Sequence, residues 1–454
     1  MAAPVEISII ERGARDSNRP NGPSFASVGP SGSGRVDAPR ADPDNAGVQG
    51  RRLSALVAVL AFWCTAVGVA PAGPQQPSRL ATKLARALSV PHVQPRLSSA
   101  VAVELTTGKT VFARHPARGL VPASNAKLAV AYAALALLGP TYQIETAVFG
   151  EGELVGRVWR GDLVLKGFGD PTLSSGDLRA LARQLRAIGI LRVTGGIETD
   201  ESYFDSRRTG PAWKPHYYIG ESPPLSALTV DRARYRGWVT REPAVTAGTQ
   251  FRLALRAAGI AVRGGVVAGV VDSFAEPLAT TASPPLSRIV AFMNRESDNF
   301  TAELLLKQVG VVDEGRGTSA AGAEGVRRAL REAAVPLAGV RIVDGSGLSA
   351  RNRLTAAALI GILITAWNDP LIRSSFVRSL AVAGVNGTLE DRLERPPSRG
   401  AVLAKTGSTQ ESSSLSGYVR GRWAFAVIQN GQPVSHHWAR RAQDRFASVL
   451  AGAQ

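Results

Sequence analysis

Cysteine is almost absent from this chain, which has one, Cys64, among its 454 residues. That cysteine lies in an apolar segment near the N-terminus, so a folded domain further along has no intramolecular disulfide, no cysteine-based metal site and no thiol nucleophile. Histidine is also scarce, and none of the five falls in an H-E-x-x-H arrangement. We therefore expect no metal and no other cofactor. A serine–histidine catalytic pair stays open, although no G-x-S-x-G elbow accompanies it.

Acidic residues are few relative to basic ones, with 36 Asp and Glu against 53 Lys and Arg and a net charge of +17. A basic protein can bind nucleic acid, but the sequence has no zinc-finger spacing, no RNP-like aromatic motif and no dense block of Lys and Arg. We therefore predict no nucleic-acid partner. We interpret the charge as suited to work beside an anionic surface, such as a cell wall or a membrane.

The N-terminal part of the chain has the composition of a tail followed by an export segment. Residues 1–50 are rich in Gly, Pro, Ser, Arg and Asp, which predicts a disordered tail. Residues 51–72 contain two arginines, an apolar run and a final Ala-Pro-Ala, a pattern typical of a secretory signal with an A-x-A cleavage site. The long preceding tail favours instead an uncleaved membrane anchor through residues 53–72. Either way, we expect the rest of the chain to be extracytoplasmic, secreted or anchored.

The remaining sequence predicts an α+β protein with an insertion. Residues 142–285 should form a mixed, mainly β inserted domain between two parts, 73–141 and 286–454, of a second domain. Strands are expected at 99–104, 110–114, 143–149, 154–159, 162–166, 191–199, 265–271, 401–405, 414–420 and 423–429. Helices are expected from residue 124 to 138 and at 177–187, 250–258, 286–294, 300–309, 319–334, 355–367, 371–379 and 436–451.

The chemistry of the chain points first to Ser124 and Lys127, an S-x-x-K motif that opens an apolar helix. Residues three apart share one helix face. A Lys at the mouth of a buried helix loses solvation, which favours its neutral form. A neutral amine beside a hydroxyl can take its proton and make it a nucleophile, and the N–H groups at the helix start can stabilise an oxyanion. The alternative interpretation is an N-cap serine followed by a surface lysine.

Two later motifs supply possible partners. Ser297 and Asn299, in the S-D-N between two helical runs, offer a hydroxyl for proton relay and an amide for a substrate or for Lys127. The K-T-G at 405–407 ends an expected strand, where Lys405 and Thr406 could bind a terminal carboxylate and Gly407 would let substrate backbone pack close. The N–H of Ser408 could complete an oxyanion hole with that of Ser124. Each motif also has a structural interpretation, as turn chemistry or a strand end.

Taken in this order, the three motifs resemble those of the penicillin-binding proteins. Three further stretches, G-D-P-T-L at 169–173, P-L-S-A-L at 224–228 and D-G-S-G-L-S at 344–349, narrow the resemblance. They are similar to segments of the D-alanyl-D-alanine carboxypeptidase/endopeptidase family of low-molecular-mass class C. The insertion before Ser297 is also a mark of that family. The resemblance covers roughly residues 80–454.

The resemblance implies a three-layer α/β/α transpeptidase-like domain and a serine acyl-transfer mechanism on peptidoglycan peptides ending in D-Ala-D-Ala. Ser124 would attack, with Lys127 as general base and Ser297 as proton shuttle. Asn299 would hold the acyl chain, and Lys405 and Thr406 the terminal carboxylate. β-Lactams would acylate Ser124 and be released slowly.

The sequence departs from the family pattern at two places. The 170 positions from Lys127 to Ser297 make a short insertion, so one of the family's two inserted subdomains is expected to be reduced or missing. The family often has an arginine directly after D-G-S-G-L-S, whereas here Ala350 comes first and Arg351 second. Arg351 and Asp170 are candidate contacts to the substrate side chain, and Asp170 can equally be a loop-closing residue. A β-lactamase and a catalytically idle peptidoglycan-binding scaffold are the alternative functions.

Overall fold

The computed structural model describes residues 78–272 and 275–453, which belong to one compact unit, Gly73–Gln454. The predicted tail and the apolar segment at 53–72 lie outside the described residues. Across the described part of the chain, no helix combines the length and the apolar character that crossing a bilayer requires.

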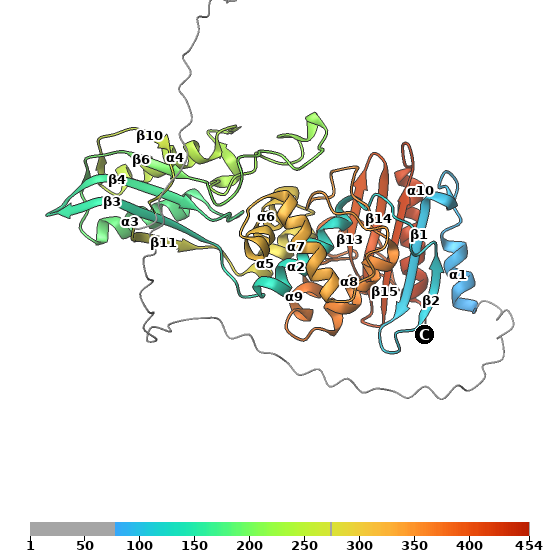
Figure 1. Cartoon of the computed structure of the whole chain (residues 1–454). Helices are drawn as coiled ribbons and strands as arrows, with labels where there is room; N and C mark the ends of the chain where they lie inside the picture. Colours follow the sequence, from blue (N-terminus) through green and yellow to red (C-terminus); the bar gives the residue numbers. More distant parts are fainter. Residues whose placement is uncertain (1–77, 273–274, 454) are drawn as a thin grey trace, which may run out of the picture. The chain divides into compact units, whose positions relative to one another are not determined.

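A six-stranded antiparallel sheet forms from strands at the two ends of the described chain (Figure 1). Its strand order is β12-β13-β14-β15-β1-β2, so the hairpin that starts the sheet pairs with the last strand of the chain. This pairing joins the parts of the domain that precede and follow the predicted insertion. The strands are β1 (Ser98–Glu104), β2 (Thr110–Arg114), β12 (Ala381–Val382), β13 (Val402–Thr409), β14 (Ser412–Val419) and β15 (Trp423–Asn430).

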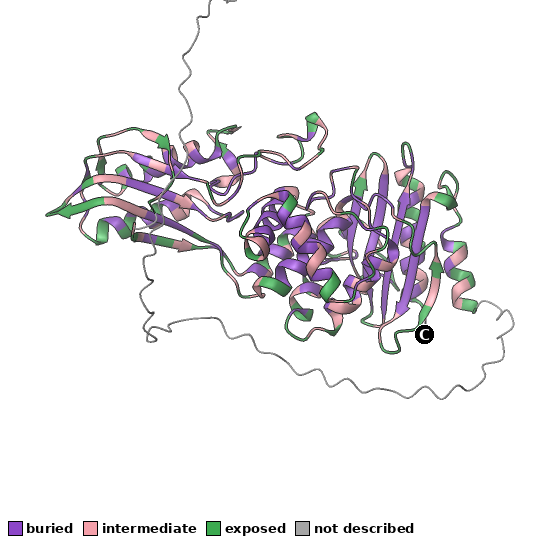
Figure 2. Cartoon of the chain, viewed as in Figure 1, coloured by how far each residue is buried: buried purple, intermediate pink, exposed green. Residues whose placement is uncertain are grey.

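Helices cover both faces of this sheet, which gives three layers. Alternate strand residues point to opposite faces: Ala102 and Phe425 pack with α1 and α10, whereas Val103 and Ala426 pack with the helices of the other face. Most residues of the central strands are buried, and the exposed ones lie near the strand ends (Figure 2). The first layer is α1 (Arg79–Ala87) and α10 (His436–Ala451), and the second is α2 (Ala126–Leu138), α5 (Leu286–Arg295), α6 (Asn299–Glu314), α7 (Ser319–Glu332), α8 (Ala356–Asn368) and α9 (Arg373–Arg378).

A second sheet of seven strands has its own core, formed with two amphipathic helices. Its main order is β10-β6-β4-β3-β11; in addition, β5 pairs with β4, and β9 pairs with β5. The strands are β3 (Glu145–Val155), β4 (Val158–Gly167), β5 (Arg192–Val193), β6 (Ile197–Asp200), β9 (Ala261–Val262), β10 (Val266–Ala268) and β11 (Pro277–Ala282); the helices are α3 (Ser175–Ala187) and α4 (Pro243–Ala257). The short hairpin β7 (Arg234–Tyr235) and β8 (Trp238–Val239) completes this part.

The transpeptidase-like arrangement and the helix and strand mixture agree with the predicted fold class, but several elements differ. The three strands expected between 143 and 166 are one long hairpin that turns at Gly156, whose φ of 63° favours glycine. The strand expected at 191–199 is two short strands separated by Gly195 and Gly196. Helix α4 begins at Pro243, earlier than expected, because proline is well suited to the first helical turn. The predicted domain boundaries at 142 and 285 stay predictions.

Candidate active site

Ser124 lies in a tight 3₁₀ turn, Ala123–Asn125, that leads directly into α2. The preceding Ala123 has φ 48°, a conformation that non-glycine residues seldom adopt. Two glycines pack against this turn: a Cβ on Gly347 would lie 1.9 Å from the Ala123 carbonyl oxygen, and one on Gly407 would lie 3.0 Å from the Ser124 nitrogen. The close approach of three separate segments therefore fixes the position of Ser124.

The side chain of Asn125 ties the same turn to the six-stranded sheet. It is fully buried, and its Nδ2 donates to the Lys405 carbonyl at 3.1 Å and to Ser414 Oγ at 2.7 Å. Ser414 Oγ in turn donates to the carbonyl of Pro122 at 2.7 Å. These buried bonds hold the start of α2 against β13 and β14.

Lys127 lies three residues after Ser124, and its side chain is fully buried. Its Nζ lies 3.0 Å from Ser124 Oγ and donates to Asn299 Oδ1 at 2.8 Å and to the Ser346 carbonyl at 2.7 Å. Burial lowers the pKa of Lys127 to about 8, although nearby carboxylates, Asp298 first among them, oppose the change. A neutral amine has two hydrogens and one lone pair. With both hydrogens donated to Asn299 and Ser346, the lone pair is left for the Ser124 hydroxyl.

The loop at 344–349 supplies the Ser346 carbonyl, and a buried carboxyl group shapes that loop. Glu303 Oε1 accepts the N–H groups of Gly345 at 3.0 Å and Ser346 at 2.8 Å. Burial, together with the charge of Asp344, raises the pKa of Glu303. Asp344 accepts the indole N–H of Trp213 at 2.9 Å, which links the loop to the segment that follows the second sheet's β6.

The S-D-N motif lies at the start of α6, directly across from Lys127. Ser297 has φ 59°, and Asp298 caps the helix by accepting the Thr301 N–H at 2.8 Å. Arg232 binds Asp298 with two hydrogen bonds, of 3.1 and 2.6 Å. Burial alone would raise the pKa of Asp298, but the bonds from Arg232 and Thr301 bring it below its ordinary value. The Asn299 amide bridges Lys127 and the carbonyl of Glu221, to which its Nδ2 donates at 3.0 Å.

The K-T-G motif lies inside β13, which continues to Thr409 rather than ending at residue 405 as predicted. The continued pairing with β14 explains the difference. Lys405 is fully buried and donates to the Thr406 carbonyl at 3.0 Å; burial, and secondarily the charge of Lys127, lowers its pKa. β12 pairs only with residues 403 and 404. On that side, the edge of β13 beyond Ala404 has no partner strand among the described residues.

These elements meet at a cavity of about 530 Å³. Five of the predicted site residues line it, namely Ser124, Ser297, Asn299, Thr406 and Ser408. Lys127, Lys405 and Gly407 lie behind them, in contact with the same turn or strand. The remaining lining residues are Glu221, Leu348, Gly387, Thr388, Asp391, Arg392 and Arg440. In the part of the chain that the structure describes, no group of three or more His, Cys, Asp and Glu side chains could hold a metal ion.

Two predicted substrate contacts are not among the residues that line the cavity. Asp170 is buried and accepts the Thr172 N–H at 2.7 Å and the Thr172 hydroxyl at 2.6 Å, which is how an aspartate closes a loop. Burial raises its pKa to about 6. Arg351 is exposed, and its backbone carbonyl accepts from Arg341 Nε at 2.7 Å. Their predicted contact with the substrate side chain stays a prediction.

Sequence reasoning missed several residues of the cavity. Glu221 comes from a stretch of Pro, Gly and aromatic residues that has little periodicity. Thr388 lies in a short 3₁₀ turn after β12, and Arg392 lies in the loop that follows it. Thr388 Oγ1 accepts from Thr406 Oγ1 at 2.8 Å. No local pattern in the sequence marks these positions. Glu303 was also missed, although its place one turn after the S-D-N motif, on the buried side of an apolar helix, was a usable signal.

Comparison with known proteins identifies the family of the chain. The family model described as D-Ala-D-Ala carboxypeptidase 3 (S13) matches residues 80–242 and 236–452. A D-alanyl-D-alanine carboxypeptidase of Actinomadura sp. (strain R39) is 32% identical over 84% of this chain and 87% of its own length. A carboxypeptidase of Mycobacterium tuberculosis is 30% identical, with the same coverage of both chains.

The fold is also similar to that of solved structures. The crystal structure of penicillin-binding protein 4 from Haemophilus influenzae superimposes with a TM-score of 0.72 at 21% identity, covering 82% of this chain and 98% of that one. A second structure of that protein, complexed with a β-lactam, gives a TM-score of 0.67 at 22% identity, with the same coverage. The chain therefore belongs to the D-Ala-D-Ala carboxypeptidase 3 (S13) family of serine-type, penicillin-binding carboxypeptidases.

Proposed function

We propose that this S13 carboxypeptidase cleaves peptidoglycan stem peptides that end in D-Ala-D-Ala, through an acyl-enzyme on Ser124. The observation that carries this assignment is the pairing of Ser124 Oγ with a buried Lys127 at 3.0 Å, where burial lowers the lysine pKa to about 8. A lysine with its ordinary pKa would be almost fully protonated at neutral pH and could not act as a base.

In the acylation step, the lone pair of Lys127 Nζ takes the proton of the Ser124 hydroxyl. The oxygen then forms a bond to the carbonyl carbon between the two D-alanines. The backbone N–H groups of Ser124 and Ser408 stabilise the oxyanion that develops on the carbonyl oxygen. Collapse of the tetrahedral intermediate breaks the peptide C–N bond. Ser297, in the same cavity, passes a proton to the departing amine of the terminal D-alanine.

In the deacylation step, a water molecule attacks the ester carbon of the acyl-enzyme. Lys127 accepts a proton from this water, with Ser297 as the relay, and Lys127 returns a proton to the Ser124 oxygen as that oxygen leaves. The products are the shortened stem peptide and free D-alanine, and the enzyme returns to its starting protonation. A β-lactam keeps its leaving group attached after ring opening, so its acyl-enzyme should be long-lived.

Substrate binding uses the unpaired edge of β13. The acyl part of the substrate adds alongside this edge as an extra strand and also contacts Asn299. The terminal carboxylate is held by Thr406, with the buried Lys405 amine behind it, where it donates to the Thr406 carbonyl. Gly407 keeps the strand close to Ser124 because a side chain there would collide with Ser414 and the Ser124 nitrogen.

The family's action on cell-wall peptides implies an extracytoplasmic enzyme. We propose that residues 53–72 direct its export, either as a cleaved signal or as a membrane anchor. Edman sequencing of the protein from the native cell would distinguish the two, because cleavage after residue 72 gives an N-terminus that begins with Gly73.

The experiment that tests the proposed function is release of D-alanine from a pentapeptide stem. Wild-type protein should release one D-alanine per peptide, and Lys127→Ala should lower kcat/KM by about 10²–10⁴-fold. Ser374→Ala, at an exposed position of α9, is the matched control and should behave as wild type. Release by Ser124→Ala at the wild-type rate would overturn the assignment. Mass spectrometry of muropeptides after digestion would show how much cross-link cleavage accompanies carboxypeptidase action.

A further inference from the structure

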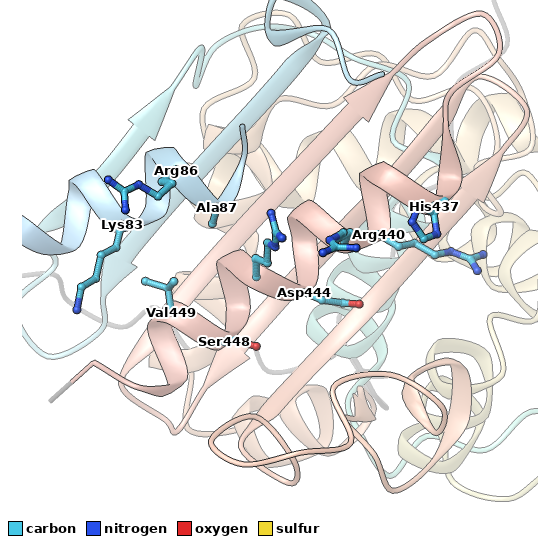
Figure 3. Close-up of a pocket in the computed structure, with 10 residues that line it drawn as sticks. Lys83, Arg86, Ala87, His437, Arg440, Asp444, Ser448 and Val449 are labelled. Atoms are coloured by element: carbon cyan, nitrogen blue, oxygen red, sulfur yellow. The ribbon is translucent and has the colours of Figure 1, made fainter. Parts of the chain in front are cut away.

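A basic groove lies on the opposite side of the six-stranded sheet from α2, between α1 and α10. Its volume is about 1140 Å³, and Figure 3 shows side chains from both helices around it. Five of the residues that line it are Lys or Arg: Lys83, Arg86, Arg440, Arg441 and Arg445. All five are exposed.

The positive charge of this groove is not neutralised from within the described chain. The one carboxylate among its lining residues, Asp444, is bound to Arg392 at 2.6 Å. Lys83, Arg86 and Arg445 make no ion pair with any described residue. Like charges gathered on two adjacent helices repel one another, so this arrangement favours an anionic partner from outside the chain.

The place of α1 in the chain indicates which partner lies within reach. The apolar segment ends at residue 72, and α1 begins at Arg79. Seven residues of extended chain span at most about 25 Å. An uncleaved anchor through residues 53–72 would therefore keep this groove within reach of the lipid headgroups.

The side chain of Trp438, beside the groove, also suits a position at the membrane surface. Trp438 is half-buried in the first turn of α10, and the Arg441 guanidinium lies 5.5 Å from its ring. Tryptophan and arginine are both common at the boundary between lipid and water. Arg440 lines the groove and also the active-site cavity, so α10 connects the two surfaces.

We propose that the groove between α1 and α10 binds the phosphate groups of anionic phospholipids and holds the catalytic unit against the outer surface of the membrane. Arginine and lysine bind phosphate oxygens by charge-assisted hydrogen bonds. Each cation near an anionic membrane strengthens association by roughly fivefold.

The test compares the full-length chain and its variants on vesicles of phosphatidylcholine with and without about 30% phosphatidylglycerol. The apolar segment and the tail contribute equally to every variant. A difference between variants in the preference for phosphatidylglycerol therefore reports on the substituted positions. Lys83→Glu/Arg86→Glu/Arg445→Glu should lower that preference by roughly a hundredfold or more. High salt should weaken the preference of the wild type.

A matched variant controls for net charge. Arg252→Glu/Arg256→Glu/Arg263→Glu changes the charge by the same amount at exposed positions on and beside α4, and should keep most of the preference. Labelling with a fluorescent penicillin checks that each variant is folded. If the glutamate variant is not labelled, the same three positions changed to glutamine should still lower the preference by about a hundredfold.

Three results would overturn the proposal: equal binding of the wild type to both kinds of vesicle, an equal loss in the control variant, or binding of a soluble poly(glycerol phosphate) without any preference for phosphatidylglycerol. The last result would assign the groove to a wall polymer. None of these results bears on D-alanine release, so the proposal and the proposed function fail separately.

Discussion

The carbonyl oxygen of Ser346 lies 2.7 Å from Lys127 Nζ, and this contact decides where the lysine lone pair points. Together with Asn299 Oδ1 at 2.8 Å, it accepts both hydrogens of a neutral amine and leaves the lone pair for Ser124. If Ser124 is the nucleophile, as we propose, the D-G-S-G-L-S loop helps to activate it through the backbone carbonyl of Ser346.

The first prediction concerns pH. Because burial lowers the pKa of Lys127 to about 8, the reactive neutral form increases as pH rises through 8 and decreases below it. At pH 7 about one molecule in ten has a neutral Lys127, against roughly one in three thousand for a lysine of pKa 10.5. The acylation rate constant for a β-lactam, measured by stopped flow, should fall about tenfold per pH unit below 7 and level off above 9. A flat profile between pH 6 and 9 would contradict this role for Lys127.

The second prediction concerns Glu303, which accepts two N–H groups of the Ser346 loop. Glu303→Ala leaves both donors buried without a partner, which should cost about 2–4 kcal/mol of unfolding free energy and lower the acylation rate. Glu303→Gln keeps an acceptor oxygen and resembles the protonated carboxyl that a raised pKa favours. It should cost less than about 1 kcal/mol. Urea unfolding of the two variants gives the comparison, and an equally large loss in Glu303→Gln would mean that the charge of Glu303 is needed.

The third prediction concerns the bidentate bond of Arg232 to Asp298, which fixes the start of α6. Arg232 is about a third exposed, so solvent screens part of the interaction. Arg232→Ala should lower stability by about 1–2 kcal/mol and reduce acylation, because the S-D-N turn loses its anchor. Arg232→Lys should restore only part of the rate, since lysine has no planar fork. If Arg232→Ala acylates like the wild type, the anchor does not position Asn299.

The fourth prediction concerns Gly407. An added Cβ would lie 2.3 Å from Ser414 Oγ and 3.0 Å from the Ser124 nitrogen, so Gly407→Ala must displace the strand or the nucleophile turn. We expect acylation to fall by about two orders of magnitude, because a misplacement of about 1 Å in an active site can cost that much. Gly265→Ala is the control, because a Cβ there meets nothing within 4 Å. Unchanged acylation of Gly407→Ala would show that this close approach is not needed.

Contacts between residues close in the sequence could be predicted from the sequence. The pairing of strands far apart in the sequence could not. The spacing of Ser124 and Lys127 predicts that their side chains meet, and they do, although Ser124 lies in a 3₁₀ turn and α2 begins only at Ala126. The apolar run around Lys127 predicts the burial that lowers the lysine pKa. The pairing of β1 with β15 joins residues more than 300 positions apart, and no local pattern encodes it.

The differences within the insertion have local physical causes. Glycines within β3 and β4 interrupt the hydrophobic pattern, but their small size lets two long strands pair without a break. The strand β11 was missed because its residues, Pro277–Ala282, have little hydrophobic alternation and are placed by pairing with β3. Glu221 reaches the cavity only through the fold of a stretch without periodicity.

The most direct test of the account is to locate the covalent adduct of a β-lactam. Trypsin should release residues 119–127 as a peptide that contains Ser124 as its one serine. We predict that penicillin adds its mass to this peptide in the wild type and that Ser124→Ala takes up no label while retaining its fold. An adduct on any other peptide, or labelling of Ser124→Ala, would contradict the assignment of Ser124 as the nucleophile.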